Sequence, residues 1–436
     1  MKFYNRTSEL AMLAKIEQLA TLAAQMTFVV GRRRIGKTSL ISKAYAHSKS
    51  LYFFVSKKSE TLLCAEFTEE IKRKLEVPIF GEIKSFKEIF ALLMELSKSQ
   101  HFTLIIDEFQ EFNTVNAAVF SDMQHLWDAH KDSSKINLVL CGSVYSLMTR
   151  IFEGSKEPLF GRATHRLHVK AFDVATLAQI MEENAPGYAK EDLLAFYLFT
   201  GGVAKYVELL LLNKALHLDA ILEYVFTENS LFIEEGKHLL IEEFGKEYGI
   251  YFSILSLIAS GKTSRPAIES ILETTVGGHL DRLENDYGLI KKIRPILAKP
   301  NSRMVKYTVE DNFLNFWFRF IFKHRSAIEI GNLAYIKELV VRDYPTFCGR
   351  FLEKYFIEKL KAEKSYNLIG TYWERDNQNE IDIVAINELS KRILIAEVKR
   401  NPNQISLPKL KEKAKKLLLD FNGYEIDYQG LSLRDM

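Results

Sequence analysis

The chain has 436 residues, of which 47% are hydrophobic and 26% charged, and its 59 basic and 56 acidic residues leave a formal net charge of +3. This length predicts two or three domains, each burying its own core. The near balance of charge excludes a protein that binds nucleic acid through bulk charge alone. The polar opening MKFYNRTSEL and the absence of a bilayer-length apolar run predict a cytoplasmic protein without membrane segments.

The stretch from Met26 to Ala46 predicts a phosphate-binding loop. Met26 to Val30 is an apolar run typical of a buried strand, and Thr38 to Ala46 has the pattern of a helix. Between them the sequence is Gly31-x-x-x-x-Gly36-Lys37-Thr38. The glycines allow backbone N–H groups to turn toward phosphates, the helix dipole adds attraction, the lysine reaches the outer phosphates and the threonine hydroxyl suits Mg²⁺. ATP and Mg²⁺ are therefore the expected cofactors.

Three consecutive arginines, Arg32 to Arg34, lie inside this loop. They either face solvent or an acidic partner across a domain interface, or one of them helps to neutralise phosphate. The first interpretation is favoured, because loop amides and Lys37 already satisfy the phosphates.

A second motif predicts hydrolysis as well as binding. Phe102 to Ile106 is a continuous apolar strand followed by Asp107, suited to holding Mg²⁺ through water, and Glu108, suited to orienting the attacking water. A strand that merely ends in acids is the alternative. Leu51 to Val55 predicts an extra strand between the two motifs, which is the arrangement of ATPases with a catalytic glutamate rather than of GTPases.

A further apolar strand, Ile136 to Cys141, is followed by Gly142 and Ser143. If this strand neighbours the acidic one, the Ser143 hydroxyl lies beside the acids and can sense the γ-phosphate. A helix cap that opens Val144 to Ile151 is the equal alternative.

These residues resemble the archaeal-type ATPase family, a branch of the AAA+/STAND P-loop ATPases. FYNRTSEL is similar to the family's F-x-x-R-x-x-E-L opening, GRRRIGKTSL and IIDEFQ match its nucleotide motifs, and PLFGRATHRL and TGGVAKYVELL resemble two later elements. The resemblance implies that Arg162 touches the γ-phosphate, in cis or from a neighbouring subunit. Ala204 stands where the family usually has proline, and no Gly-x-x-Arg second sensor is evident. Nucleotide contacts are implied for Arg6, Gly31, Arg34, Ile35, Gly36, Lys37, Thr38 and Ser39.

From Tyr251 the pattern becomes three short helices and two short strands, the layout of a winged helix-turn-helix. His279 and Arg282 would face a DNA groove, and the wing would carry Lys291, Lys292, Arg294, Arg303 and Lys306 against phosphates. Packing as a lid over the nucleotide domain is the favoured alternative. In the following segment Phe313, Phe316, Trp317 and Phe320 have the spacing of one helical face, which predicts core packing rather than a cofactor cage.

The C-terminal stretch NEIDIVAINELSKRILIAEVKR predicts a hairpin of Ile381 to Ile386 and Arg392 to Arg400. If it turns near Leu389, Asp382 lies opposite or next to Glu397, and Lys399 shares a face with Glu397. Two carboxylates so close repel unless a hard divalent cation lies between them, and the lysine can polarise a phosphate.

Asp382 with Glu397-x-Lys399 resembles the PD-(D/E)XK nuclease core, and Glu353 occupies the place of the helix acid that precedes the strands of that fold. Proline is absent before Asp382. The following helix, LPKLKEKAKKLLL, is basic and suits a phosphate backbone. A salt-bridged hairpin without metal, or a nuclease fold that has lost activity, are the alternatives.

The expected fold is α/β: a parallel-sheet P-loop ATPase core (1–172), a helical lid (173–245), a winged helix (246–310), an aromatic helical connector (311–345) and a restriction-endonuclease-like α/β domain (346–436). The expected function is an ATP-hydrolysing switch that controls a Mg²⁺-dependent nuclease-like domain acting on or binding DNA. A DNA-binding regulator, or a signalling ATPase with an inactive nuclease-like domain, are the alternatives. An oligomer or a protein partner stays open.

Overall fold

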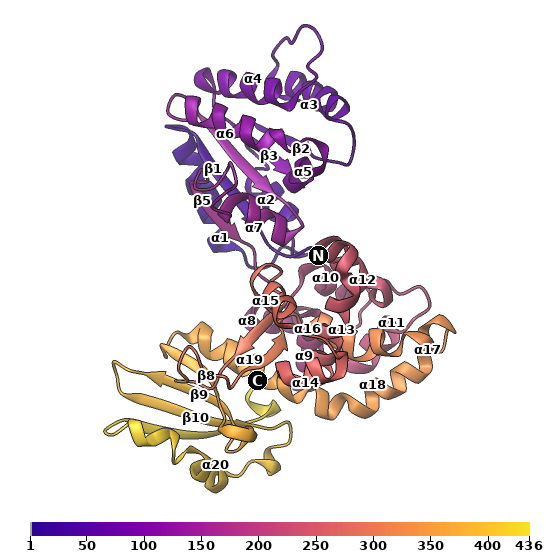
Figure 1. The fold of residues 1–436 in the computed structure, drawn as a ribbon, viewed down its shortest axis with the longest axis vertical. Helices are drawn as coiled ribbons and strands as arrows, with labels where there is room; N and C mark the ends of the chain where they lie inside the picture. Colours follow the sequence, from indigo (N-terminus) through magenta and orange to yellow (C-terminus); the bar gives the residue numbers. More distant parts are fainter. Residues whose placement is uncertain (1) are drawn as a thin grey trace. The chain divides into compact units, whose positions relative to one another are not determined.

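The computed structural model describes residues 2–436, apart from the side chains of Glu242, Lys246 and Asp376. The chain forms two compact units (Figure 1): an N-terminal unit of residues 5–171 and a C-terminal unit of residues 2–4 and 172–436. The junction after Ala171 falls next to the predicted end of the ATPase core. The finer division of residues 173–436 stays a prediction.

The N-terminal unit is built on a five-stranded parallel sheet of order β2-β3-β4-β1-β5. Its strands are β1 (Gln25–Val30), β2 (Ser50–Phe54), β3 (Phe102–Asp107), β4 (Ile136–Cys141) and β5 (His165–His168). Its helices are α1 (Thr7–Ala20), α2 (Lys37–Ala44), α3 (Glu60–Leu75), α4 (Phe86–Ser99), α5 (Phe112–Val115), α6 (Ala118–His130) and α7 (Tyr145–Glu153). The strands predicted within residues 26–30, 51–55, 102–106 and 136–141 are confirmed, with ends that differ by at most one residue.

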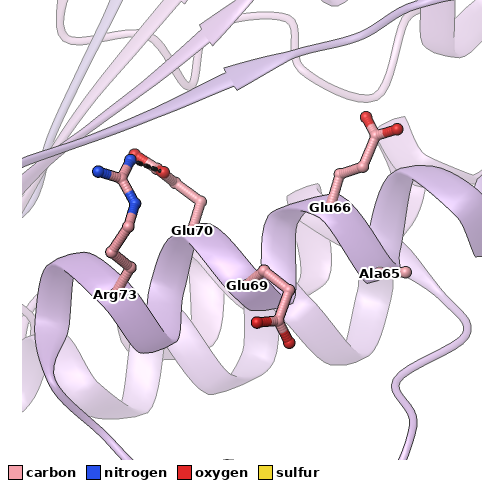
Figure 2. Close-up of a pocket in the computed structure, with 5 residues that line it drawn as sticks. All are labelled: Ala65, Glu66, Glu69, Glu70 and Arg73. Carbon is pink, nitrogen blue, oxygen red and sulfur yellow. Dashed lines mark hydrogen bonds and ion pairs between the residues drawn. The ribbon is translucent and has the colours of Figure 1, made fainter.

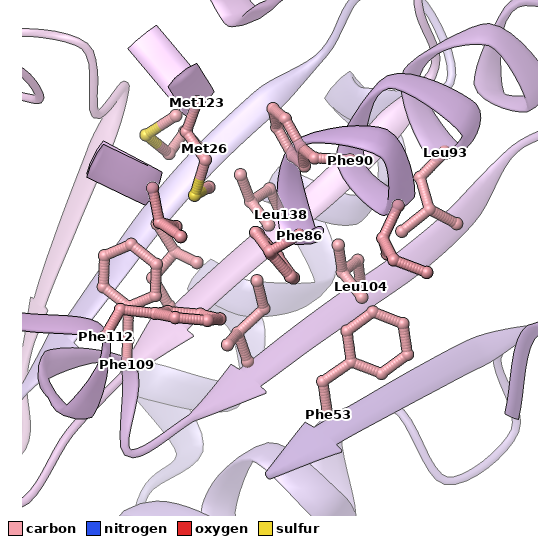
Figure 3. Packing of buried hydrophobic residues seen from close by; sticks show 14 of the residues in the cluster. Met26, Phe53, Phe86, Phe90, Leu93, Leu104, Phe109, Phe112, Met123 and Leu138 are labelled. Atoms are coloured by element: carbon pink, nitrogen blue, oxygen red, sulfur yellow. The ribbon is translucent and has the colours of Figure 1, made fainter. Parts of the chain in front are cut away.

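A large aromatic core holds α3, α4 and α6 against one face of this sheet. Figure 3 shows Phe86 and Phe90 of α4 beside Leu104 of β3 and Leu138 of β4, and all four side chains are fully buried. Alternate residues of each strand point to the other face, where α1 contacts β1 and β4. Because both faces are covered, the central strands are apolar along nearly their whole length. The sheet is therefore a rigid platform for the loops at its carboxyl edge.

The C-terminal unit begins with helices that lead into a two-stranded ribbon. They are α8 (Val174–Asn184), α9 (Lys190–Thr200), α10 (Ala204–Leu212), α11 (Leu218–Val225), α12 (Leu231–Phe244), α13 (Tyr248–Ala259), α14 (Arg265–Leu272) and α15 (Gly277–Asn285). The ribbon consists of antiparallel β6 (Ile290–Ile293) and β7 (Lys306–Val309). Pro266 occupies the first turn of α14, where its missing N–H costs nothing.

The aromatic segment after the ribbon is core, as its spacing predicts. Helix α16 (Asn312–Phe316) continues into a π-helical turn, Trp317–Ile321. Phe313, Phe316, Trp317 and Phe320 are each at most 3% exposed. Trp317 Nε1 also donates a hydrogen bond to the Ile233 carbonyl of α12, 2.8 Å away. The aromatic cluster therefore fastens the helices on either side of it, and α17 (Arg325–Glu329) and α18 (Leu333–Phe347) follow.

The chain ends in a four-stranded mixed sheet of order β11-β10-β9-β8, in which only the β10–β11 pair is parallel. Helix α19 (Gly349–Glu363) precedes it, and its elements are β8 (Leu368–Tyr372), β9 (Ile381–Asn387), β10 (Arg392–Val398), α20 (Leu407–Ala414) and β11 (Glu425–Leu431). Helix α20 packs on Ile381, Ile393 and Ile395 through Leu410 and Ala414. The predicted hairpin is confirmed.

Candidate functional site

The predicted phosphate-binding loop joins the end of β1 to the start of α2. A Cβ atom on Gly31 would lie 2.6 Å from the Val169 carbonyl oxygen, so no side chain fits there. Gly36 has φ of 93°, a value that L-residues rarely adopt, and directly precedes the first turn of α2. Arg34 also has positive φ, at 65°. These angles give the loop its tight curl around the N-terminus of the helix.

Lys37 lies folded into this loop. Its Nζ donates hydrogen bonds to the carbonyl oxygens of Gly31 at 2.7 Å and Arg32 at 3.0 Å, and the residue is 8% exposed. Burial lowers the pKa of this ammonium, while nearby Cys141, Glu108 and Asp107 oppose the shift. A positive charge held by neutral carbonyls can exchange them for phosphate oxygens when an anion enters the loop.

Asp107, at the end of β3, accepts four hydrogen bonds. Thr38 Oγ1 (3.1 Å) and the Tyr52 hydroxyl (2.6 Å) donate to Oδ2, and the Glu108 backbone N–H (2.9 Å) and Cys141 Sγ (3.1 Å) donate to Oδ1. Burial and the Asp107 carboxylate raise the pKa of the Cys141 thiol well above its usual value, which keeps it a donor. The paired Thr38 hydroxyl and Asp107 carboxylate are hard oxygen ligands facing each other. They fit a Mg²⁺ ion bound with nucleotide.

Glu108 follows with a left-handed backbone, φ 53°, that few residues of its type adopt. Its Oε2 accepts hydrogen bonds from Ser143 Oγ at 2.7 Å and from Gln110 Nε2 at 2.5 Å. Strands β3 and β4 are neighbours, so the premise of the γ-phosphate sensor interpretation holds. The alternative, a helix cap, stays a prediction: α7 begins at Tyr145 after Val144, which makes no side-chain cap, and the Ser143 hydroxyl donates to Glu108.

The structure places the predicted arginines in three different settings. Arg33 Nε donates to Ser143 Oγ at 3.3 Å, so this arginine lies close to the acidic edge, and the preferred solvent or interdomain role stays a prediction. Arg6 is 7% exposed and donates to the Lys170 carbonyl at 2.5 Å and the Ile35 carbonyl at 3.4 Å. Arg6 therefore stabilises the phosphate-binding loop through its hydrogen bond to the Ile35 backbone. Arg162 pairs with Asp128 of α6 at 3.2 Å and donates to the Phe160 carbonyl.

Ser39 and Thr38 are the exposed positions at the start of α2, whereas Ile35 is buried. A separate depression on α3, drawn in Figure 2, is lined by Glu66, Glu69, Glu70, Arg73 and Ala65 of that one helix. Its charges are ordinary helix-surface pairs such as Arg73 with Glu70. It has none of the converging groups found at the loop.

In the C-terminal sheet, Asp382 and Glu397 lie opposite each other in the hairpin, one residue beyond the last β9–β10 pair, Ile383 with Ala396. Lys399 Nζ lies 3.1 Å from Asp382 Oδ2 and 3.6 Å from Glu397 Oε1. Lys413 of α20 lies 3.2 Å from the same Glu397 oxygen. We call these four residues the acid–lysine cluster. In it two ammonium groups neutralise the two carboxylates.

Glu353 of α19 lies near this cluster. Burial, and after it the charge of Asp382, raise the pKa of Glu353 to about 8. Glu380 is half exposed and pairs with Lys306 at 2.7 Å. Among the residues that the structure describes, no three acidic, histidine or cysteine side chains form a metal-binding group. Two carboxylates are nevertheless suitable donors for a hard cation, which would replace the lysines there.

The ribbon is docked on the C-terminal sheet. Ile296, in the loop between β6 and β7, donates its N–H to the Thr371 carbonyl of β8 at 2.8 Å, and Lys306 lies 4.5 Å from the Trp373 ring centroid. On α15, Arg282 contacts Glu247 and the Tyr251 hydroxyl, each at 3.3 Å. The His279 ring packs against that of Tyr251. The residues proposed for a DNA groove therefore have partners within the chain, because α15 packs on α13, while Lys291 stays exposed.

Sequence reasoning missed the side chains that orient the acids: Tyr52, Cys141, Gln110 and Lys413. Tyr52 and Cys141 lie in strands that motif analysis identified, but contact between strand tips depends on strand order. Lys413 was seen only as one basic residue of a helix. No signal in the sequence singles out which lysine of α20 meets Glu397.

Comparison with known proteins agrees with the nucleotide site. Residues 3–210 match the model of an ATPase domain predominantly from Archaea. The chain contains an archaeal-type ATPase domain. Residues 317–415 match a family of archaeal and bacterial proteins of unknown function. An uncharacterized protein of Methanocaldococcus jannaschii is 29% identical over 406 residues, covering 91% of this chain and 87% of the relative.

Among solved structures, a Walker-type ATPase of Pyrococcus abyssi is similar to this chain, with a TM-score of 0.55 and 16% identity. The similarity covers 72% of this chain and 96% of that protein. At this identity the likeness concerns the fold alone, and it extends beyond the ATPase domain. Among the described residues, no helix is both long and apolar enough to span a membrane.

Proposed function

We propose that this protein is a Mg²⁺-dependent ATP hydrolase that works as a switch, and that its nucleotide state controls the acid–lysine cluster of the C-terminal sheet. One observation carries the first half. The end of β3 and the residue after it, Asp107 and Glu108, meet the start of α2 and the residue that follows Gly142 at one edge of the parallel sheet. Thr38 lies 3.1 Å from Asp107, and Ser143, after β4, contacts Glu108 at 2.7 and 3.3 Å. The Lys37 ammonium lies near both acids. This edge is where α/β folds bind nucleotides.

Each residue has a defined task in this proposal. Lys37 exchanges its carbonyl partners for the outer phosphates, and Thr38 and Asp107 would hold Mg²⁺, which neutralises charge developing on the phosphates when bound. Glu108 accepts a proton from the attacking water, and Ser143 and Gln110 set the direction of its carboxylate. Arg33, through Ser143, adds a positive charge near the γ-phosphate position. Arg162 is proposed to add a second positive charge near the γ-phosphate once its ion pair with Asp128 breaks.

The test of this half is Lys37→Ala, with Lys43→Ala as the matched control at the far end of the same helix. ATP affinity is measured with a fluorescent analogue and turnover by phosphate release. We expect the first variant to lose both, and the control to keep both. Unchanged affinity and turnover in Lys37→Ala would show that the loop does not bind ATP.

The second half concerns the acid–lysine cluster, which we propose is a nuclease-like site of the PD-(D/E)XK type. Support comes from the convergence of Asp382, Glu397 and Lys399 near the ends of adjacent strands, with Glu353, whose pKa burial raises to about 8, near them. Asp382 and Glu397 would hold Mg²⁺, and Lys399 would then polarise a phosphate. The ribbon hydrogen-bonds to β8, and its Lys306 pairs with Glu380, the residue before β9; we propose that it is part of a winged helix that couples the helices to this sheet.

Cleavage of plasmid, linear and single-stranded DNA with Mg²⁺ or Mn²⁺, with and without ATP, tests this half. We expect cutting that changes with ATP and disappears in Asp382→Ala and Lys399→Ala. Absence of cutting under every condition, with ATP turnover intact, would reject the active nuclease.

That outcome would favour a second candidate, a regulator or signalling ATPase with an inactive nuclease-like domain. The neutralisation of both carboxylates by Lys399 and Lys413 favours it, because such a cluster is balanced without metal. A DNA-binding regulator should lose binding in an Arg282→Glu, Lys291→Glu variant and keep it in Asp382→Ala. A gel-shift experiment at low salt separates this regulator from a signalling ATPase, which would bind no nucleic acid.

A further inference from the structure

Tyr52 lies on β2, the edge strand next to β3, and its hydroxyl meets the candidate Mg²⁺-binding carboxylate. The 2.6 Å contact from this hydroxyl to Asp107 Oδ2 is the shortest of the four that Asp107 accepts. An ionised carboxylate offers about four lone-pair positions. In this structure donors therefore occupy all four.

Water bound to Mg²⁺ needs one of these positions, because Asp107 is expected to hold the ion through such a water. The Glu108 donor is a backbone N–H next to Asp107 itself, and Cys141 is fully buried in β4. Thr38 can keep donating its proton while its oxygen binds the metal. Tyr52, at 39% exposed, is the donor with room to leave and with solvent to replace its lost hydrogen bond.

We propose that the Tyr52 hydroxyl stands in for a metal-bound water, holding Asp107 oriented while the site is empty and leaving when Mg²⁺ arrives with nucleotide. Tyr52 is thus a positioning residue that opposes premature metal binding. The inference rests on the proposed function, because it assumes that Asp107 is a metal ligand.

The direction in which metal affinity changes when the Tyr52 hydroxyl is removed distinguishes this role from one in which Tyr52 only orients Asp107. A residue that only supported the carboxylate would weaken metal binding when its hydroxyl is removed. A residue that competes with a metal-bound water would strengthen it, because the metal no longer displaces a hydrogen bond to a charged group.

The experiment is a Mn²⁺ titration of the full-length protein followed by the EPR signal of free Mn²⁺, with and without ADP. The difference isolates nucleotide-dependent binding from binding at the acid–lysine cluster. We expect Tyr52→Phe to bind Mn²⁺ about threefold or more tighter than the unaltered protein. Tyr45→Phe, at the far end of α2, is the matched control and should leave the affinity unchanged.

An unchanged or weaker Mn²⁺ affinity in Tyr52→Phe overturns the inference. Tyr52→Leu also lacks the hydroxyl and gives a second test if the first variant folds poorly by circular dichroism. The Asp107→Asn variant tests the proposed metal site on which this inference rests. If this variant leaves the ADP-dependent Mn²⁺ affinity unchanged, Asp107 is not a metal ligand and the proposed site is wrong. Adding Mg²⁺ and ADP should change the near-UV tyrosine absorption of the unaltered protein, because the Tyr52 hydroxyl loses its hydrogen bond to Asp107. The part of this change that comes from Tyr52 should be missing in Tyr52→Phe.

Discussion

Ser143 Oγ donates a hydrogen bond to Glu108 Oε2 over 2.7 Å, which joins the residue after β4 to the residue after β3. The Ser143 backbone N–H also donates to the same oxygen, over 3.3 Å, so one residue supplies two hydrogen bonds to the Glu108 carboxylate. A general base held in this way has its direction set before substrate binds. The contact is thus the first place to test how hydrolysis is organised.

Ser143→Ala should slow ATP turnover by about tenfold to hundredfold while ATP affinity stays near that of the unaltered protein, because the variant frees the base without touching the phosphate-binding loop. Steady-state turnover and analogue binding measure the two quantities. Ser143→Thr keeps the hydroxyl and should recover much of the rate. Turnover within twofold of the unaltered protein in Ser143→Ala would remove Ser143 from the mechanism.

Arg6 distinguishes a structural from a nucleotide-binding role. Its guanidinium donates to the carbonyls of Lys170 and Ile35 and pairs with Glu9 at 3.0 Å. Arg6→Gln should therefore lower the free energy of unfolding by about 2 kcal/mol, since hydrogen bonds to a charged group are lost at a buried site. Urea unfolding with and without ATP measures this. If the variant loses ATP affinity but no stability, Arg6 contacts the nucleotide, as the family resemblance implies.

Glu353 predicts a pH dependence of stability. The pKa of this carboxyl rises from 4.5 to about 8, chiefly through burial, so the folded state keeps a proton that the unfolded state has lost over this range. Ionisation in the folded state is therefore unfavourable, and the residue destabilises the fold progressively as pH rises from about 4.5 to about 8.

Glu353→Gln removes this titration. In EDTA, the variant should match the unaltered protein near pH 4.5 and exceed its unfolding free energy by a few kcal/mol, to order of magnitude, near pH 8.5. Chemical denaturation at both pH values measures the difference. A stability difference that does not change with pH would show that Glu353 ionises normally.

Gly202 and Gly161 form a matched pair for backbone strain. Both have positive φ, 73° and 71°, but a Cβ on Gly202 would lie 2.2 Å from the Phe172 carbonyl oxygen, whereas one on Gly161 meets nothing within 4 Å. Gly161→Ala should cost about 1 kcal/mol of stability from the backbone alone. Gly202→Ala should cost clearly more, because Phe172, whose N–H donates to the Gly202 carbonyl at 2.8 Å, must move. Equal costs in thermal unfolding would contradict this.

The sequence determined those features that depend on neighbours along the chain. Glycines 31 and 36 with Lys37 require one loop geometry, and buried strands at residues 102–107 and 136–141 are evident because both of their faces are covered. The hairpin register follows from the short turn after Asn387, so the meeting of Asp382 with Glu397 was predictable.

Tertiary structure alone decided which distant groups meet. Tyr52 reaches Asp107 only because β2 lies beside β3, Lys413 reaches Glu397 only because α20 packs on the hairpin, and Arg282 faces Tyr251 because α15 packs on α13. Strand order and helix packing arise from the summed burial of many apolar side chains rather than from any local motif. Motifs therefore located the chemistry of this protein, and the packing of its core selected the side chains that orient it.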